Sequence, residues 1–202
     1  IEDALNSKLI NRVIVSTDNE YYAEIARSFG AETPFLRPAE ISQDSSNDRD
    51  LFVHALNWLR ENENYVPDIC VQLRPTHPIR KLEDIDAMIN LLLERPDADC
   101  VRAIVKNETY TPYKMWFLNG DNELTPIMNG TGISEHYNQP RQALPLTYFQ
   151  NASIDVIRTS TIINKKSLTG DKILGYLMDE EYDIDNEKEF IRAQQKIVEM
   201  NL

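Results

Sequence analysis

Short apolar runs and longer amphipathic stretches alternate along the first half of the chain. The apolar runs lie at residues 12–16, 31–36, 69–73 and 100–105, and polar or proline residues bound them, which is typical of strands. Apolar residues recur with the period of a helix at residues 20–30, 51–59 and 82–94. Strands that alternate with helices of this length predict crossover connections, a mostly parallel sheet and an α/β fold.

The pattern changes after residue 107. Between 107 and 148, prolines and glycines break several short extended pieces, which predicts hairpins and loops that leave the main sheet. Regular structure resumes at 154–158, and the last helix is predicted to begin near Asn186. We expect a single domain over 1–202 with an excursion at 107–148. Because the chain opens at Ile1 inside helix-like sequence, we expect it to be N-terminally incomplete.

Composition narrows the possible partners. Hydrophobic residues make up 42% and charged residues 27% of 202 residues, as in ordinary globular proteins. The formal charge of -12 opposes a phosphate backbone, so we expect no nucleic-acid partner. No apolar run approaches the ~20 residues of a membrane helix, which favours a cytoplasmic protein without a membrane partner. Cys70 and Cys100 lie inside apolar runs and are predicted to be core residues.

The first candidate site is the sequence Asp183-Ile184-Asp185. Two carboxylates two residues apart point the same way on an extended backbone, and a bend before a helix would present both to a hard cation such as Mg²⁺. The alternative is a helix N-terminus, where acidic residues are favoured by the helix dipole. Spacing alone leaves both interpretations open.

The second candidate is the loop at residues 72–80, which follows a predicted strand. Arg74, Thr76 and Arg80 lie there around the rigid Pro75 and Pro78, at the strand end where α/β folds bind ligands. A structural turn is the alternative, and His77 alone is interpreted as a loop residue rather than a general base.

The third candidate combines Arg141 with Lys114. Both are cations in proline-bounded segments among amides and aromatic residues, a lining that suits a carboxylate-bearing, hydroxyl-rich ligand. Simple loop charges are the alternative. The glycines form neither a Walker loop nor a dinucleotide fingerprint, and no nucleophile elbow is present.

Taken in order, these segments resemble those of the acylneuraminate cytidylyltransferases, the CMP-sialic acid synthetases. The resemblance rests on Val15-Ser-Thr-Asp18, Leu36-Arg-Pro-Ala-Glu40, Gln72-Leu-Arg-Pro-Thr-His-Pro-Ile-Arg80, Pro112-Tyr-Lys114, Gln139-Pro-Arg-Gln-Ala-Leu-Pro145, Gln150-Asn151 and Asp183-Ile-Asp185. It implies a Rossmann-like nucleotidyltransferase fold of the nucleotide-diphospho-sugar transferase type, with a homodimerisation excursion. It also implies an enzyme that joins a keto-sugar acid to CTP and releases pyrophosphate.

The resemblance also assigns residues. Asp183 and Asp185 match the family's Mg²⁺ ligands, and Arg141 matches a catalytic arginine at the sugar-acid site. Arg37 is implied to lie near the nucleotide, with Ser45 or Ser46 beside it. The implied sugar-acid contacts are Arg74, Thr76, Lys114, Arg141, Gln142, Asn151 and Asp155.

The chain departs from the family pattern in three ways. The family's first strand and its basic phosphate loop precede the equivalent of Ile1. Ala152 and Asp155 replace a glycine and a tyrosine of the sugar pocket, and His77 replaces a serine. These departures leave the sugar acid undefined. They also keep two alternatives open: a glycosyltransferase that uses Asp183-Ile184-Asp185 as its metal motif, and a non-catalytic sugar-acid- or nucleotide-binding relative.

Overall fold

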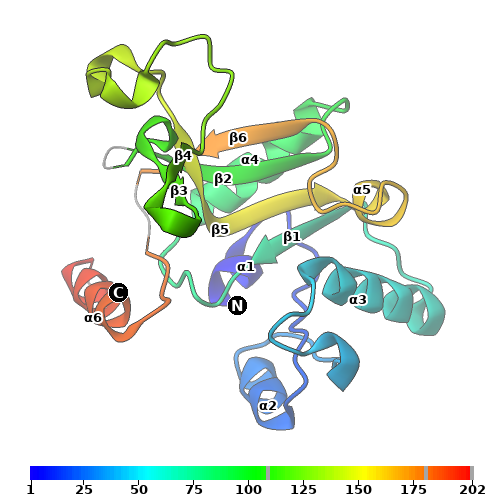
Figure 1. Cartoon of the computed structure of the whole chain (residues 1–202). Helices are drawn as coiled ribbons and strands as arrows, with labels where there is room; N and C mark the ends of the chain where they lie inside the picture. The colour runs from blue at the N-terminus through cyan, green and yellow to red at the C-terminus, as the bar shows by residue number, and fades with distance from the viewer. Residues whose placement is uncertain (108–109, 180–181, 201–202) are drawn as a thin grey trace.

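A four-stranded mixed sheet forms the centre of the computed structural model, which describes residues 1–107, 110–179 and 182–200 (Figure 1). Its strands are β1 (Ile69–Leu73), β2 (Cys100–Lys106), β5 (Tyr148–Arg158) and β6 (Ile173–Leu177), in the order β1-β5-β2-β6. β6 is parallel to β2, whereas β5 is antiparallel to both β1 and β2. Three of the four strands therefore run in the same direction, in agreement with the predicted mostly parallel sheet.

Helix α4 (Leu82–Glu94) covers one face of this sheet. It has the predicted bounds, and its apolar stripe packs on alternate residues of β2 and β5. The packed residues are Ile85, Met88, Ile89 and Leu92 from the helix, and Val101, Ala103, Ile154 and Val156 from the strands. Fully burying a side chain of this size is worth about 1.5–3 kcal/mol, so this layer is the main core of the protein.

Among the described residues, helices cover the opposite face of the sheet only at one end. There α3 (Asp48–Glu63) and α5 (Thr159–Ile163) pack through Leu56 and Ile162 on the row formed by Cys70, Ile157 and Cys100. Cys100 is buried and Cys70 is half-buried, and both thiols are free, which confirms their prediction as core residues. Further along the strands this face becomes polar.

The N-terminal segment carries α1 (Glu2–Asn6), α2 (Glu20–Ser28) and the 3-10 turn η1 (Ala39–Ile41). The segments at 12–16 and 31–36 are extended but share only one parallel bridge, between Ile14 and Glu32. Pro34 lacks the N–H group that would continue the pairing, and the next backbone bond comes only at Arg37. The prediction of a strand at 12–16 was therefore wrong, whereas 31–36 is the short extended piece that the pattern indicates.

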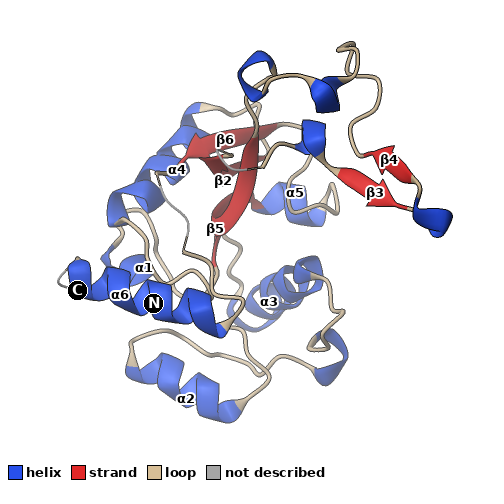
Figure 2. Cartoon of the chain, turned by 60° about the vertical axis from the view of Figure 1, so that its left-hand side comes forward, coloured by secondary structure: helices blue, strands red, loops and turns tan. Residues whose placement is uncertain are grey.

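The predicted excursion contains a small hairpin and several single turns (Figure 2). β3 (Trp116–Leu118) pairs with β4 (Leu124–Pro126), outside the main sheet. The turns are η2 (Pro112–Lys114), η3 (Gly120–Asn122), η4 (His136–Asn138) and η5 (Arg141–Ala143). His136 is buried at the centre of these turns, with Nδ1 2.6 Å from the Tyr113 carbonyl and Nε2 2.7 Å from that of Met128.

The last helix, α6 (Glu187–Glu199), begins where the sequence predicted it. The Asn186 side chain accepts hydrogen bonds from the amides of Lys188 and Glu189, at 3.1 and 3.2 Å. Glu189 in turn accepts from the Asp185 amide at 2.8 Å, which completes a reciprocal N-terminal cap. Among the residues that the structure describes, no helix is long and apolar enough to cross a membrane.

Asp99 holds the turn before β6 against the start of β2. Its carboxylate accepts hydrogen bonds from the amides of Asp171 and Lys172, at 2.8 and 3.0 Å, and pairs with Lys165 at 2.8 Å. A Cβ at Gly170 would overlap this carboxylate, and Gly170 has a φ of +67°, so the turn requires glycine. The Lys165 ammonium, followed by the Lys172 amide, holds the pKa of Asp99 well below its usual range.

We expect Asp99→Asn to lower the free energy of unfolding at pH 7 by about 1–3 kcal/mol, because two backbone amides and the Lys165 ammonium lose a charged acceptor. A depressed pKa stabilises the fold above the unfolded-state value of about 3.9, and this contribution is lost as the pH falls through the folded-state value. The unfolding free energies of the native chain and of Asp99→Asn, measured with urea, should therefore become more similar below about pH 4. An equal difference at pH 7 and pH 3 would contradict this assignment.

Candidate active site

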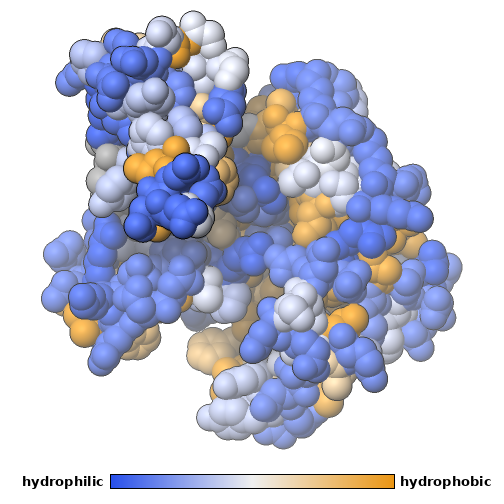
Figure 3. Space-filling model, viewed as in Figure 1, coloured by the Kyte–Doolittle hydropathy of each residue, from blue (hydrophilic) through white to orange (hydrophobic). Residues whose placement is uncertain are grey.

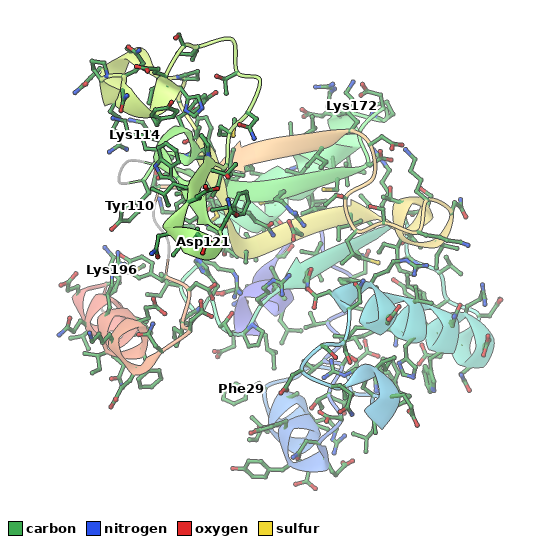
Figure 4. The ribbon with its side chains drawn as sticks, viewed as in Figure 1. Phe29, Tyr110, Lys114, Asp121, Lys172 and Lys196 are labelled. Atoms are coloured by element: carbon green, nitrogen blue, oxygen red, sulfur yellow. The ribbon has the colours of Figure 1, made fainter. Side chains whose placement is uncertain are left out.

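The candidate site lies where β1, β2 and β6 end. Because these strands run in the same direction, their carboxyl ends meet at one edge of the sheet, the edge at which α/β folds bind ligands. Figure 3 shows a recess in the surface between the excursion, α6 and the side formed by α2 and α3, with hydrophilic residues inside it. In Figure 4, Lys114 marks the excursion side of this edge and Lys196 marks α6.

A polar row crosses the sheet on the face opposite α4. Gln72 and Arg102 both stand beside Asp155, because the strand register pairs each of them with it. The Asp155 carboxylate is only 2% exposed and accepts two hydrogen bonds from Arg102, at 2.8 Å from Nε and 3.2 Å from Nη2. Burial raises the pKa of Asp155, and the Arg102 guanidinium opposes that rise. The row therefore contains a two-point ion pair between a buried carboxylate and a half-buried guanidinium.

A second ion pair lies at the end of β1. The Arg74 Nη2 atom donates to Asp48 Oδ2 at 2.6 Å, and Gln72 Nε2 is 3.4 Å from the same oxygen. Asp48 is the first residue of α3, so this contact joins the helix to the strand end. Arg74 Nε is buried and has no hydrogen-bond partner in the described part of the chain. Arg74 thus lies on the polar face, beside the row.

Arg80 fastens the predicted ligand loop to the sheet. Its Nε atom donates to the Ser153 carbonyl at 3.2 Å, and its Nη2 atom donates to the Arg74 carbonyl. Burial lowers the pKa of this guanidinium below its ordinary value. Thr76 is exposed at the outer part of the loop. The loop is therefore a fixed structure whose two ends are held by one half-buried side chain.

The segment that carries Asp183 and Asp185 is brought against this loop from more than a hundred residues away. The Ile184 amide donates to the Thr76 carbonyl at 2.9 Å, and also lies 3.1 Å from the Asp183 carboxylate. Asp183 is half-buried and Asp185 is exposed at the start of α6. Thus two candidate motifs that were predicted separately lie together.

His77 lies at this junction. It is fully buried, and its Nε2 atom accepts a hydrogen bond from the Tyr182 amide at 3.2 Å. Burial lowers the pKa of His77, as does the charge of Arg80, whereas Asp183 opposes the shift. The interpretation of His77 as a loop residue is correct in position, but it misses this contact with the Asp183 segment.

The carboxylates of Asp183 and Asp185 are suitable ligands for Mg²⁺. None of the described residues forms an ion pair with Asp183 or Asp185 within 4.0 Å. The described residues contain no group of three or more histidine, cysteine or acidic side chains that could hold a metal by themselves. Mg²⁺ is commonly bound by one or two carboxylates together with substrate phosphates and water, which two open carboxylates at a ligand-binding edge allow.

The residues that the resemblance places near the nucleotide lie before α3. Arg37 donates from Nε to Ser42 Oγ at 2.9 Å, and its Nη2 atom is 3.8 Å from Asp18. Ser46 accepts a hydrogen bond from the Gln43 amide at 2.8 Å, whereas Ser45 is exposed in the same turn. Ser46 therefore shapes the turn, and Ser45 presents its hydroxyl to solvent.

The implied sugar-acid residues divide into exposed and buried groups. Lys114, Arg141 and Gln142 are exposed on the excursion, and Arg141 donates to the Asn107 carbonyl at 2.9 Å. Asn151 is buried: its side chain accepts from the Ser153 amide at 3.2 Å and lies 3.3 Å from Met178 Sδ. Its contacts are with the fold, so it supports the bend of β5 at Ala152, where the backbone φ is 56°.

Sequence reasoning missed Asp48 and Arg102. Arg102 could have been found, because a charged residue inside the apolar run 100–105 needs a buried partner. Asp48 gave no such signal, because an acidic residue at a helix start has a sufficient local explanation.

Comparison with known proteins identifies the family. A family model described as "Cytidylyltransferase" matches residues 1–197. The N-acylneuraminate cytidylyltransferase of Escherichia coli O18:K1:H7 is 28% identical over 97% of this chain, which spans 45% of that protein. The CMP-N,N'-diacetyllegionaminic acid synthase of Campylobacter jejuni is 28% identical over 98% of this chain and 80% of its own length. The chain thus spans less than half of the first of these relatives.

A solved structure confirms the predicted fold class. The structure of a CMP:2-keto-3-deoxy-manno-octonic acid synthetase complexed with CTP superposes with a TM-score of 0.66, over 100% of this chain and 86% of its own. At 14% sequence identity this similarity shows the fold alone, an α/β fold of the Rossmann-like type. Since the family match extends over almost the whole chain, this protein belongs to the cytidylyltransferase family.

Proposed function

We propose that this chain supplies the catalytic domain of a CTP-dependent cytidylyltransferase that activates a sialic-acid-like keto-sugar acid. The family match over residues 1–197 carries the proposal, and the two relatives named above make CMP derivatives of nonulosonic acids. In the proposed reaction the anomeric hydroxyl oxygen bonds to the α-phosphorus of CTP. The bond from that phosphorus to the β-phosphate bridge breaks, pyrophosphate leaves, and the hydroxyl proton passes to solvent.

Asp183 and Asp185 are proposed to hold Mg²⁺. A bound Mg²⁺ would neutralise charge on the triphosphate. The support is the pair of carboxylates without cationic partners among the described residues, fixed beside the loop at 74–80. Arg37, with Ser45 and Ser46, is proposed to lie on the nucleotide side, where it would supply positive charge in a chain with a formal charge of -12.

The sugar acid is proposed to lie between the polar row and the excursion. Arg74, Thr76 and Asp155 would face its hydroxyls, whereas Arg141 and Lys114 would bind its carboxylate, because a guanidinium fork matches that group. Gln142 lies beside Arg141 on the excursion. Asn151 is proposed to act indirectly, by supporting the bend of β5. Arg102 would orient Asp155 through their two-point ion pair.

A homodimer that uses the excursion 107–148 is also proposed. The hairpin formed by β3 and β4 has no third strand in the described part of the chain, and isolated two-stranded hairpins are marginally stable in water. Its large apolar side chains are exposed, with Phe117 at 58%, Leu118 at 68% and Leu124 at 57%. Aromatic residues are enriched in interface cores, so a second copy would cover this surface.

A cytoplasmic location is also proposed, and the two free thiols support it.

Pyrophosphate release tests the activity. With Mg²⁺ and CTP, we expect turnover with at least one member of a panel containing N-acetylneuraminate, N,N'-diacetyllegionaminate and 2-keto-3-deoxy-octonate. We expect UTP and GTP to support at most a few per cent of the rate with CTP, on the order of the discrimination that base-specific hydrogen bonds provide. Equal use of UTP, or no turnover with any acidic keto-sugar, would overturn the proposed function.

Substitution of the paired carboxylates tests the metal site. Asp183→Ala and Asp185→Ala should each lower kcat by roughly 10²–10³-fold without changing the circular dichroism spectrum, because a ligand is lost and no core packing changes. The matched control is Asp179→Ala, since Asp179 is an exposed carboxylate of the preceding segment that pairs with Lys81 at 2.7 Å. Native turnover in Asp185→Ala would leave only the helix-terminus explanation for that residue.

Light scattering tests the dimer. At micromolar concentration the chain should have twice its 23.4 kDa mass, and the double variant Phe117→Glu with Leu118→Glu should have the monomer mass. The matched control is Val66→Glu, which adds a charge at an equally exposed apolar residue, 60% exposed, after α3. A monomeric mass for the unsubstituted chain would contradict the proposed interface.

A further inference from the structure

His77 is fully buried between two segments that are distant in sequence. Its Nε2 atom accepts a hydrogen bond from the Tyr182 amide at 3.2 Å, across 105 residues. Since an amide N–H is the donor, Nε2 must carry its lone pair and the ring proton must be on Nδ1. Nδ1 is itself buried and has no hydrogen-bond partner in the described part of the chain. The hydrogen bond at Nε2 therefore links the buried ring directly to the Asp183 segment.

A second bond makes the contact between the two segments rigid. The Thr76 carbonyl, adjacent to His77, accepts the Ile184 amide at 2.9 Å. The donors of the two hydrogen bonds are the amides of Tyr182 and Ile184, so the backbone is held on both sides of Asp183. Beyond this point, the cap at Asn186 and Glu189 fixes the start of α6. The direction of the Asp183 side chain is thus set by the loop as well as by the helix.

The loop end of this contact is also fixed. Arg80 bonds the Ser153 and Arg74 carbonyls, so the loop that carries His77 is joined to β5 and to the end of β1. The sheet, the loop and the Asp183 segment therefore form one continuous hydrogen-bonded path. Only the bond at His77 Nε2 in this path depends on a side chain that is itself fully buried.

We infer that His77 is a positioning residue, which fixes the Asp183 carboxylate in the site by accepting the Tyr182 amide. Its effect on metal binding depends on the proposed function, whereas the contact itself does not. A serine, which the family resemblance leads one to expect at this position, has a much shorter side chain than the imidazole ring. The contact therefore depends on a position at which this chain departs from the pattern that the resemblance implies.

Amide hydrogen exchange, measured by NMR on the metal-free protein, tests the contact without any need for activity. His77→Leu keeps an apolar volume but removes the acceptor, and should speed exchange at Tyr182 by roughly 3- to 10-fold, the factor expected for one lost hydrogen bond. His77→Gln places its side-chain oxygen near the Nε2 position and should stay close to the native rate. The Val101 amide, in the centre of the sheet, is the internal control for an intact fold. Unchanged exchange at Tyr182 in His77→Leu would overturn the contact.

Metal dependence tests the positioning role. In His77→Leu the apparent Mg²⁺ constant for activation, and the Mn²⁺ dissociation constant measured by paramagnetic relaxation, should both rise by about 3- to 10-fold. His77→Gln should restore both, and the KM for CTP at saturating Mg²⁺ should stay within about twofold of native. Faster exchange with unchanged Mn²⁺ binding would reduce His77 to a purely structural role and overturn the inference. If the native chain shows no turnover, the exchange and Mn²⁺ measurements still decide the question.

If His77→Leu does not fold, His77→Asn replaces it. The asparagine side chain places its amide oxygen near the Nδ1 position and is too short to reach the Tyr182 amide. This variant therefore removes the same hydrogen bond but keeps a polar side chain. We expect the same faster exchange at the Tyr182 amide and the same weaker Mn²⁺ binding as for His77→Leu, and no change in either measurement would overturn the inference.

Discussion

The polar side of the sheet depends on the ion pair between Arg102 and Asp155. A carboxylate that is 2% exposed would be unfavourable by several kcal/mol without its partner, so the pairing of β2 with β5 must bring these residues together. The same register places Val101 beside Val156 on the α4 side. A slip of one residue would move apolar side chains to the polar face and charges into the core. One pair thus fixes both the core and the floor of the candidate site.

The reversed direction of β5 determines where its bend lies. Because β5 runs opposite to β1 and β2, its N-terminal half meets the edge where their ligand loops begin. The bend is at Ala152, which has a φ of 56° in the left-handed region that glycine adopts without steric cost. The family resemblance leads one to expect glycine here, so this chain keeps the bend at some conformational cost. Asn151 and Arg80 both bond to Ser153 and hold the bend in place.

Local patterns predicted the elements well, and distant contacts explain what they missed. The stripe of α4 and the helix after Asp185 were predictable because each has a periodic apolar face or an N-terminal cap within a few residues. The strand expected at 12–16 has suitable composition, but pairing depends on a partner that composition does not specify. The sequence did not predict the contact that His77 makes, for the same reason: its partner lies 105 residues away.

The distribution of charge separates two parts of the proposed sugar site. Arg102 and Arg74 are already paired with Asp155 and Asp48, so the floor of the site is close to electrically neutral. A neutral, hydrogen-bonding floor suits hydroxyl groups and gives little attraction to a carboxylate. The cations Lys114 and Arg141 lie instead on the exposed excursion. In a chain with a formal charge of -12, an anionic sugar would therefore be drawn to the excursion side and present its hydroxyls to the sheet.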